Sequence, residues 1–497
     1  MRKIRRFWLR GAVFLLILAN VVMMINRILT PKYFYNHMWP TTSTYLGFYE
    51  MEKDTADVIF LGSSHGASSF SPQVLYNRYG ITSYNLSCEQ QNLLVSYYWL
   101  KEALRYQSPK AVILDCYMLF PYNKHEPLNT SEGCTRKALD YMRWSPVKWE
   151  AVHAVCEEDK NQSLSSYYLP NVRFHTRWTG LNEEDFTYSE MGEHYEMKGF
   201  TAISYYSGNK DYRPFSWEEG AEEEEEPMVE LMKKYLDKIT VLCRQENISL
   251  ILVKTPSTAQ NIKRHQAIRN YAGEHGLPFF DFNEKDLYRA IGFEFAKDNC
   301  DGGHGSVWGA AKITCYLGNV LRARYGIEGR TERQWEESRE YYAGVIRDCT
   351  IGKVTDADSY LALLNDCRYW VFIAVKDEAS RYLDEEMAGK LRALGLEAML
   401  EGQNRCSYYG ILVDGQVKEQ AGYERLKETG TMRGGRSMYD VVSAGYECGN
   451  ECSIKIDGKE YGKNQRGLNI VVYNHVTKAV VDSVCFDTYE EGSPARR

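Results

Sequence analysis

Apolar and polar residues follow two repeating patterns between residues 50 and 328. Short apolar runs of strand length stand between longer segments with the periodicity of amphipathic helices. Strands separated by such helices form βαβ units, which require a parallel sheet with helices on both faces. We therefore expect a three-layer α/β domain. The predicted strands are 58–61, 81–86, 111–115, 249–256 and 278–282, and the predicted helices include 72–79, 91–106, 228–245 and 306–324.

An insertion from about residue 120 to 227 interrupts this alternation. It is rich in tyrosine and tryptophan and shows no convincing sequence of strands and helices. Ligands of parallel sheets bind at the carboxyl ends of the strands, and this insertion follows such an end. We expect it to form a wall or lid of a site.

The C-terminal part has a different pattern. A charged linker at 329–345 leads into residues 346–490, where one helix accompanies segments that alternate with a period of two. Turns at Asp457-Gly458 and Asn474-His475 predict β-hairpins. We expect a β-rich α+β domain, and no pair of nucleophile and base is evident in it.

An apolar segment from about Phe7 to Leu29 follows the basic start M-R-K-I-R-R. Its uninterrupted part has the length of a signal-peptide core, but no small-x-small cleavage site follows it. Arg10 and Arg27 lie near its ends, where long side chains reach the membrane interface. We interpret residues 1–30 as a cytoplasmic basic tip and an uncleaved, single-pass signal anchor. By the positive-inside rule, the rest of the chain then lies outside the cytoplasmic membrane.

Composition narrows the classes of function. The chain of 497 residues is too long for one ordinary core, and 44% apolar residues favour globular folding. A net charge of -7 and a pI near 5.9 do not favour a nucleic-acid partner. The 13 cysteines include no C-x-x-C pair, so we expect neither a metal site nor a cofactor. Cys448 and Cys452 are close enough in sequence for a disulfide, although all the thiols could equally stay reduced.

The first predicted strand ends at Gly62 and leads directly into Ser63, Ser64 and His65. A serine at the carboxyl end of a parallel strand is well placed to act as a nucleophile. A serine in a strand-to-helix turn is also the usual N-cap of the following helix. This stretch alone favours the capping role.

A second motif lies far along the chain. Asp301 and His304 stand three residues apart on a glycine-rich loop before the last helix of the α/β region. The carboxylate can fix the tautomer of the histidine, whose other ring nitrogen then serves as a base. The alternative is a capping aspartate beside a surface histidine. Together with a serine at the end of the first strand, this motif favours catalysis.

The Gly-x-Ser turn, the late Asp-x-x-His and the following Gly309 resemble the SGNH (GDSL) hydrolase superfamily over about residues 55–328. The similarity is greatest to its membrane-anchored, extracytoplasmic branch, which includes the teichoic-acid D-alanyl transfer protein and the alginate-type O-acetyltransferases. The resemblance implies Ser64 as nucleophile, His304 as base and Asp301 as the acid, with Ser63 in the place usually held by aspartate.

The sequence departs from this family at the oxyanion hole. The second block of the family supplies a glycine and the third an asparagine, whereas the corresponding strand ends here read N-L-S-C-E-Q-Q-N at 85–92 and L-D-C-Y-M-L-F at 114–120. An oxyanion hole must therefore be built from other donors. The candidates are the Ser64 N–H, an N–H near Ser87 or Cys88, and the amide of Gln90 or Gln91, with Ser63 beside them.

The C-terminal domain resembles the interleukin-like EMT inducer (ILEI/PANDER) domain. An R-G-x-N-x-x-V-x-N strand leads to a V-x-D-x-x-x-F-D turn, and an aliphatic strand running into acidic residues matches 371–380. In the family this last signature follows the others, whereas here it precedes them, as in a circular permutation. The matching residues are Arg466, Gly467, Asn469, Val472, Asn474, Val481, Asp482, Phe486 and Asp487. The resemblance implies a carbohydrate-binding module.

Together these features predict a membrane-anchored acyl esterase or O-acyltransferase of cell-envelope polysaccharide. Esterase and transferase cannot be separated from the sequence, because both proceed through an acyl-enzyme. The expected partners are envelope glycan, the cytoplasmic membrane and a membrane-bound acyl-donor transporter. The alternative is a catalytically silent glycan-binding scaffold that retains the fold.

Overall fold

The computed structural model describes residues 2–31, 41–182, 184–187, 195–216, 224–259 and 261–497. The chain divides into two compact units, Met1–Ala343 and Gly344–Arg497. The division falls within the stretch that the sequence predicts as a linker. Most of that stretch belongs to a helix, α16 (Arg333–Ile351). The expectation of a mixed α/β protein is confirmed.

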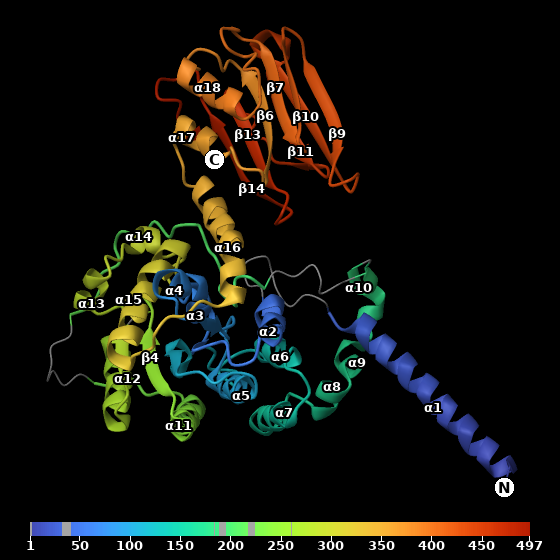
Figure 1. Ribbon diagram of the computed structural model, residues 1–497, viewed down its shortest axis with the longest axis vertical. Coiled ribbons are helices and arrows are strands. Elements are labelled where there is room, and N and C mark those ends of the chain that lie inside the picture. The colour runs from blue at the N-terminus through green and yellow to red at the C-terminus, as the bar shows by residue number, and fades with distance from the viewer. Residues whose placement is uncertain (1, 32–40, 183, 188–194, 217–223, 260) are drawn as a thin grey trace. The chain divides into compact units, whose positions relative to one another are not determined.

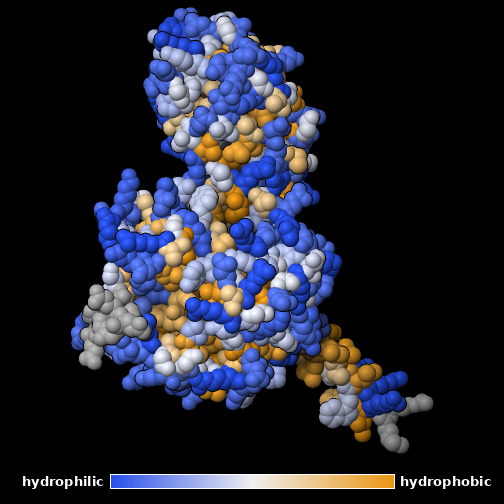
Figure 2. Space-filling model, turned by 60° about the vertical axis from the view of Figure 1, so that its left-hand side comes forward, coloured by the Kyte–Doolittle hydropathy of each residue, from blue (hydrophilic) through white to orange (hydrophobic). Residues whose placement is uncertain are grey.

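The N-terminal helix α1 (Arg2–Leu29) is the one helix in the described part of the chain that is long and apolar enough to cross a membrane. Its apolar side chains point outward; for example, Phe7 is 72% exposed. Figure 2 shows this helix as a hydrophobic projection from a largely hydrophilic surface. An exposed apolar helix of this length matches the hydrocarbon thickness of a bilayer.

A five-stranded sheet with the order β2-β1-β3-β4-β5 forms the centre of the first unit. All four strand pairs are parallel, as the alternating pattern predicts. The strands are β1 (Val58–Leu61), β2 (Ser83–Asn85), β3 (Ala111–Asp115), β4 (Ser249–Lys254) and β5 (Phe279–Asp281). The chain leaves β1 toward β2 and then returns to place β3 on the other side of β1. This reversal creates a topological switch point, where ligands of open α/β sheets bind.

Helices cover both faces of this sheet (Figure 1). Ile59 and Leu61 of β1 belong to a core that includes side chains of the first group of helices, while Val58 and Phe60 belong to a second core on the other face. The first group is α5 (Leu93–Ala103), α11 (Glu230–Gln245) and α12 (Ile262–His275). The second group is α4 (Pro72–Tyr79) and α15 (Val307–Tyr325). Neighbouring residues of a strand point to opposite faces, which is why apolar runs without alternation form a sheet buried on both sides.

The regular secondary structure in the described part of the insertion between β3 and β4 is helical, whereas residues 201–214 form neither helix nor strand. Val147, Ala151 and Val155 of α7 bury one side of that helix in the first core. The helices are α6 (Glu132–Asp140), α7 (Pro146–Glu158), α8 (Leu164–Tyr168), α9 (Pro170–Phe174), the 3-10 helix η2 (His175–Gly180) and α10 (Glu184–Thr187).

The second unit is built on a curled ten-stranded sheet with two helices, α17 (Ala357–Leu363) and α18 (Glu385–Ala393). The central strand β6 (Tyr369–Asp377) directs Val371 and Ile373 into a core shared with these helices and Phe372 into a second core. The other main strands are β7 (Ser407–Val413), β8 (Gln416–Gly422), β9 (Leu426–Met432), β10 (Ser437–Gly445), β11 (Glu451–Ile456), β13 (Gly467–Asn474) and β14 (Ala479–Phe486), with the two-residue strands β12 (Lys459–Glu460) and β15 (Ala495–Arg496).

Both predicted hairpin turns join antiparallel neighbours, β11 to β12 and β13 to β14. The 13 cysteines all lie in the described residues, and none of them forms a disulfide; Cys448 and Cys452 are therefore not bridged.

Candidate active site

The turn after β1 depends on glycine at position 62. Gly62 has a φ of +153°, and a Cβ there would lie 2.5 Å from the Cβ of Asp115. Asp115 ends the neighbouring strand β3, so the two strand ends approach each other closely at the switch point. Glycine permits both the backbone conformation and the approach.

Asp115 holds the turn in place. Its Oδ2 atom accepts hydrogen bonds from the Ser63 hydroxyl at 2.6 Å and from the Ser63 N–H at 3.2 Å. Ser63 is in turn the N-cap of the short helix α3 (Ser64–Ser69), because its Oγ accepts from the His65 N–H. Burial raises the pKa of Asp115, and the bonds from Ser63 oppose that rise. The capping role expected of a serine here thus belongs to Ser63, which leaves the Ser64 hydroxyl available for chemistry.

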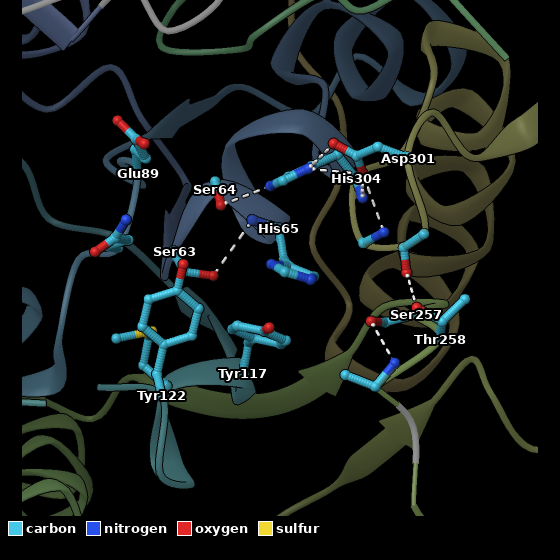
Figure 3. Close-up of a pocket in the computed structure, with 15 residues that line it drawn as sticks. Ser63, Ser64, His65, Glu89, Tyr117, Tyr122, Ser257, Thr258, Asp301 and His304 are labelled. Carbon is cyan, nitrogen blue, oxygen red and sulfur yellow. Dashed lines mark hydrogen bonds and ion pairs between the residues drawn. The ribbon is translucent and has the colours of Figure 1, made fainter. Parts of the chain in front are cut away.

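Ser64, His304 and Asp301 form one chain of hydrogen bonds (Figure 3). The Oγ of Ser64 lies 2.8 Å from Nε2 of His304. The other ring nitrogen, Nδ1, lies 2.8 Å from Oδ2 and 2.9 Å from Oδ1 of Asp301. In the tautomer with the proton on Nδ1, His304 donates to Asp301 and accepts from Ser64. This is the arrangement in which a serine hydroxyl is activated as a nucleophile.

The loop that carries His304 is anchored from two sides. The N–H of Thr258, in the loop after β4, donates to the Gly302 carbonyl at 2.7 Å, and the N–H of Gly305 donates to the Ser68 hydroxyl of α3 at 3.2 Å. Gly309 lets the start of α15 pack against this loop, since a Cβ there would lie 2.1 Å from the Asp298 carbonyl oxygen. Elements that are distant in sequence thus bring His304 to Ser64.

Asp301 is held in its ionised form. Burial on its own would raise the pKa of Asp301, but the bond and charge of His304 and the N–H groups of Gly303 and His304 lower it well below its usual range. Tyr205, from the insertion, places its hydroxyl 3.5 Å from Oδ2 of Asp301. Burial and this carboxylate raise the pKa of Tyr205 to about 12. A persistent negative charge beside Nδ1 stabilises the imidazolium that forms when His304 takes a proton.

The three residues open into a cavity of about 320 Å³. Its wall combines hydroxyl, amide and carboxylate groups with two tyrosine rings, and the insertion contributes Tyr122 to it. The lining residues besides the triad are Ser63, His65, Glu89, Gln90, Tyr117, Met118, Tyr122, Ser257, Thr258, Ala259, Gly302 and Gly303. Hydroxyl and amide groups around a small cavity suit a polar substrate better than a long acyl chain.

The structure separates the predicted oxyanion residues into two groups. Gln90 and Ser63 line the cavity, whereas Ser87, Cys88 and Gln91 do not. The N–H of Ser87 donates to Asn85 Oδ1, and the N–H of Cys88 donates to the Gly62 carbonyl. The Gln91 amide nitrogen donates to the Leu86 carbonyl and to Ser96. These donors hold the loop after β2 and are not directed at the Ser64 hydroxyl.

His65 is a member of the site that the sequence analysis did not identify. Its ring is buried, stacks on Tyr117 with centroids 3.6 Å apart, and has its centroid 5.0 Å from that of His304. Burial and the neighbouring His304 lower the pKa of His65 well below its usual value, so its ring is neutral. The sequence did offer an indication that His65 belongs to the site, because it directly follows Ser64. Asp115 could likewise have been suspected from its place at the end of the strand beside the turn.

Among the residues that the structure describes, no three His, Cys, Asp or Glu side chains gather as a metal site would require. No protein-family model matches this chain, and no curated protein matches it.

Proposed function

We propose that the protein is a serine acyl esterase or O-acyltransferase of SGNH type that acts on cell-envelope polysaccharide. The observation that supports this most is the hydrogen-bonded chain from Ser64 through His304 to Asp301 at the switch point of a parallel sheet. A serine that only caps a helix and a histidine that only lies on the surface need not contact each other, whereas Ser64 Oγ and His304 Nε2 lie 2.8 Å apart although 240 residues separate them in sequence.

In the proposed reaction, Nε2 of His304 removes the Ser64 proton while Oγ attacks an ester carbonyl. The imidazolium is stabilised by Asp301 and returns its proton to the leaving alcohol, which leaves the acyl group on Ser64. Water or a sugar hydroxyl, deprotonated by His304, then releases the acyl group. The first outcome is hydrolysis and the second is transfer.

The negative charge on the carbonyl oxygen needs hydrogen-bond donors. The Ser64 N–H stands in the first turn of α3, where helix geometry leaves N–H groups without an acceptor inside the helix. Gln90, which lines the same cavity, supplies a second donor, because its Oε1 accepts from Thr130 and its amide N–H groups then remain for the substrate. Loss of one such donor typically costs about a hundred- to a thousandfold in rate.

The setting of the reaction is part of the proposal. Helix α1 would anchor the chain, and the basic residues before it would keep the N-terminus in the cytoplasm and both units outside. The second unit would bind glycan and raise the local concentration of the polymer near Ser64. Protease treatment of intact, wall-stripped cells should digest both units, and full protection would refute this topology.

A fluorophosphonate probe tests the catalytic proposal, because it labels only activated serines. The full chain in detergent should be labelled, and Ser64→Ala should abolish labelling. Ser257→Ala is the matched control, since Ser257 lines the same cavity but its hydroxyl accepts from the Ala259 N–H. An unlabelled wild-type chain would instead favour a catalytically silent scaffold.

A further inference from the structure

Exposed aromatic side chains gather on the helical insertion, away from the cavity. Trp144 stacks on Tyr168, with ring centroids 5.1 Å apart. The ring centroid of His153 lies 4.0 Å from that of Trp149 and 6.4 Å from that of Tyr168. Trp178 in η2 is 70% exposed. We call this set the aromatic patch: Trp144, Trp149, Tyr168, Leu169, Val172 and Trp178, each between 43% and 70% exposed.

The core of the unit does not account for these side chains. On α7, Val147, Ala151 and Val155 face the core, whereas Trp149 lies on the opposite side of the helix and is 51% exposed. Large aromatic residues exposed together are uncommon on soluble surfaces and mark an interaction site.

The patch borders the end of α1. The N–H of Asn171, in α9, donates to Asn26 Oδ1 at 2.9 Å, and the Arg177 guanidinium, in η2, donates to the Leu29 carbonyl at 2.6 Å. Leu29 is buried in this contact region. Figure 1 shows α9, α8 and α7 leading away from this end of α1. The aromatic patch therefore begins where the apolar helix ends.

We propose that the aromatic patch lies in the headgroup region of the bilayer that α1 crosses, and so forms a second membrane attachment. This inference rests on the membrane anchor of the proposed function. Tryptophan and tyrosine are enriched at membrane interfaces, because their rings are apolar while the indole N–H or phenol O–H stays hydrated. Leu169 and Val172 add purely apolar area, as in helices that lie in the interface.

Two attachments constrain the unit more than one helix does. A helix alone lets the attached unit tilt on the membrane, whereas a patch beside the helix end fixes which side faces the lipid. The aromatic patch would thus hold the cavity around Ser64 at a defined height above the bilayer. The accessible substrate would then be polymer that passes at that height.

Brominated lipids test the proposal, because bromine quenches tryptophan fluorescence only at short range. The full chain is reconstituted into nanodiscs of phosphatidylcholine and phosphatidylglycerol, with and without bromine near the upper part of the acyl chains. The test variant is Trp144→Phe/Trp149→Phe/Trp178→Phe, which removes three fluorophores and keeps apolar rings. The quantity measured is the drop in tryptophan emission caused by the brominated lipid. We expect this drop to be much smaller in the triple variant than in the wild type, with Trp8 in α1 responsible for what remains.

The control variant Trp308→Phe/Trp370→Phe removes tryptophans outside the patch, so the absolute drop in emission caused by the brominated lipid should stay as large as in the wild type. Trp149→Glu places a charge in the proposed interface and should reduce quenching of the other patch tryptophans. Equal quenching in the wild type and the triple variant would overturn the proposal, and would be the result if glycan or another protein covered the patch. Failure of the anchor itself is a separate outcome, in which alkaline carbonate releases the chain and no variant is quenched.

Discussion

Replacing Asp301 by asparagine tests whether the carboxylate positions the base. An amide at this position can donate a hydrogen bond to Nδ1 of His304, which favours the tautomer with the proton on Nε2. That tautomer cannot accept the Ser64 proton. When His304 takes the Ser64 proton, the variant also lacks the hydrogen bond between the Asp301 carboxylate and the imidazolium, and a hydrogen bond to a charged group contributes about 1.5–3 kcal/mol.

Each 1.36 kcal/mol of barrier is a factor of ten in rate, so the expected loss is about 10- to 150-fold. The Asp301 side chain is 38% exposed, and solvent therefore moves the expectation toward the lower end of this range. The assay is the initial rate of hydrolysis of a small activated ester by the full chain, with Asp211→Asn as a control at an exposed surface position. Binding of the small ester should change little, so the loss should appear in kcat. A rate for Asp301→Asn within about twofold of the wild type would refute the positioning role.

Three further predictions concern the turn, the buried histidine and the second unit. Gly62→Ala should destabilise the protein by more than about 2 kcal/mol, since its Cβ would meet Asp115 and its φ is unfavourable; an unchanged urea midpoint would contradict this. The lowered pKa of His65 means that below about pH 6.5 the unfolded chain binds a proton that the folded chain does not, so the free energy of unfolding should fall by up to about 1.4 kcal/mol per pH unit as the pH decreases. His65→Phe, which preserves stacking on Tyr117, should flatten the difference between urea midpoints at pH 7.5 and 5.5, and a slope equal to that of the wild type would show that His65 is not the group responsible. Deleting residues 352–497 should leave Ser64 reactive toward the fluorophosphonate but slow modification of polymeric glycan, and a full rate on polymer would exclude a capture role for the second unit.

Much of the architecture follows from local pattern. Strands β1, β3 and β4 are short, largely apolar runs between amphipathic helices, and the periodicity of such strands and helices can be recognised within about ten residues. Helix α1 is equally local, since length and apolarity suffice to predict it. The approximate positions of Ser64 and His304, one at a strand end and one before a helix, follow from the same reasoning.

The distribution of hydrogen bonds could not be predicted in this way. Whether the N–H groups of Ser87 and Cys88 are available depends on Asn85 and Gly62, and the sequence does not show that these residues already accept from them. The carboxylate that accepts from the Ser63 hydroxyl belongs to Asp115, at the end of the neighbouring strand β3. A hydrogen bond between side chains of neighbouring strands leaves no periodic pattern in the sequence.

The sequence by itself determined which segments are strands, helices and a candidate membrane anchor, and which residue types stand at the strand ends. Only the tertiary structure decided that Ser64 meets His304, that Ser63 caps the helix α3, and that the His65 ring is buried near that of His304. The physical reason is that secondary structure depends on side-chain periodicity along a short stretch, whereas the availability of a donor or the pKa of a ring depends on neighbours brought together from distant parts of the chain.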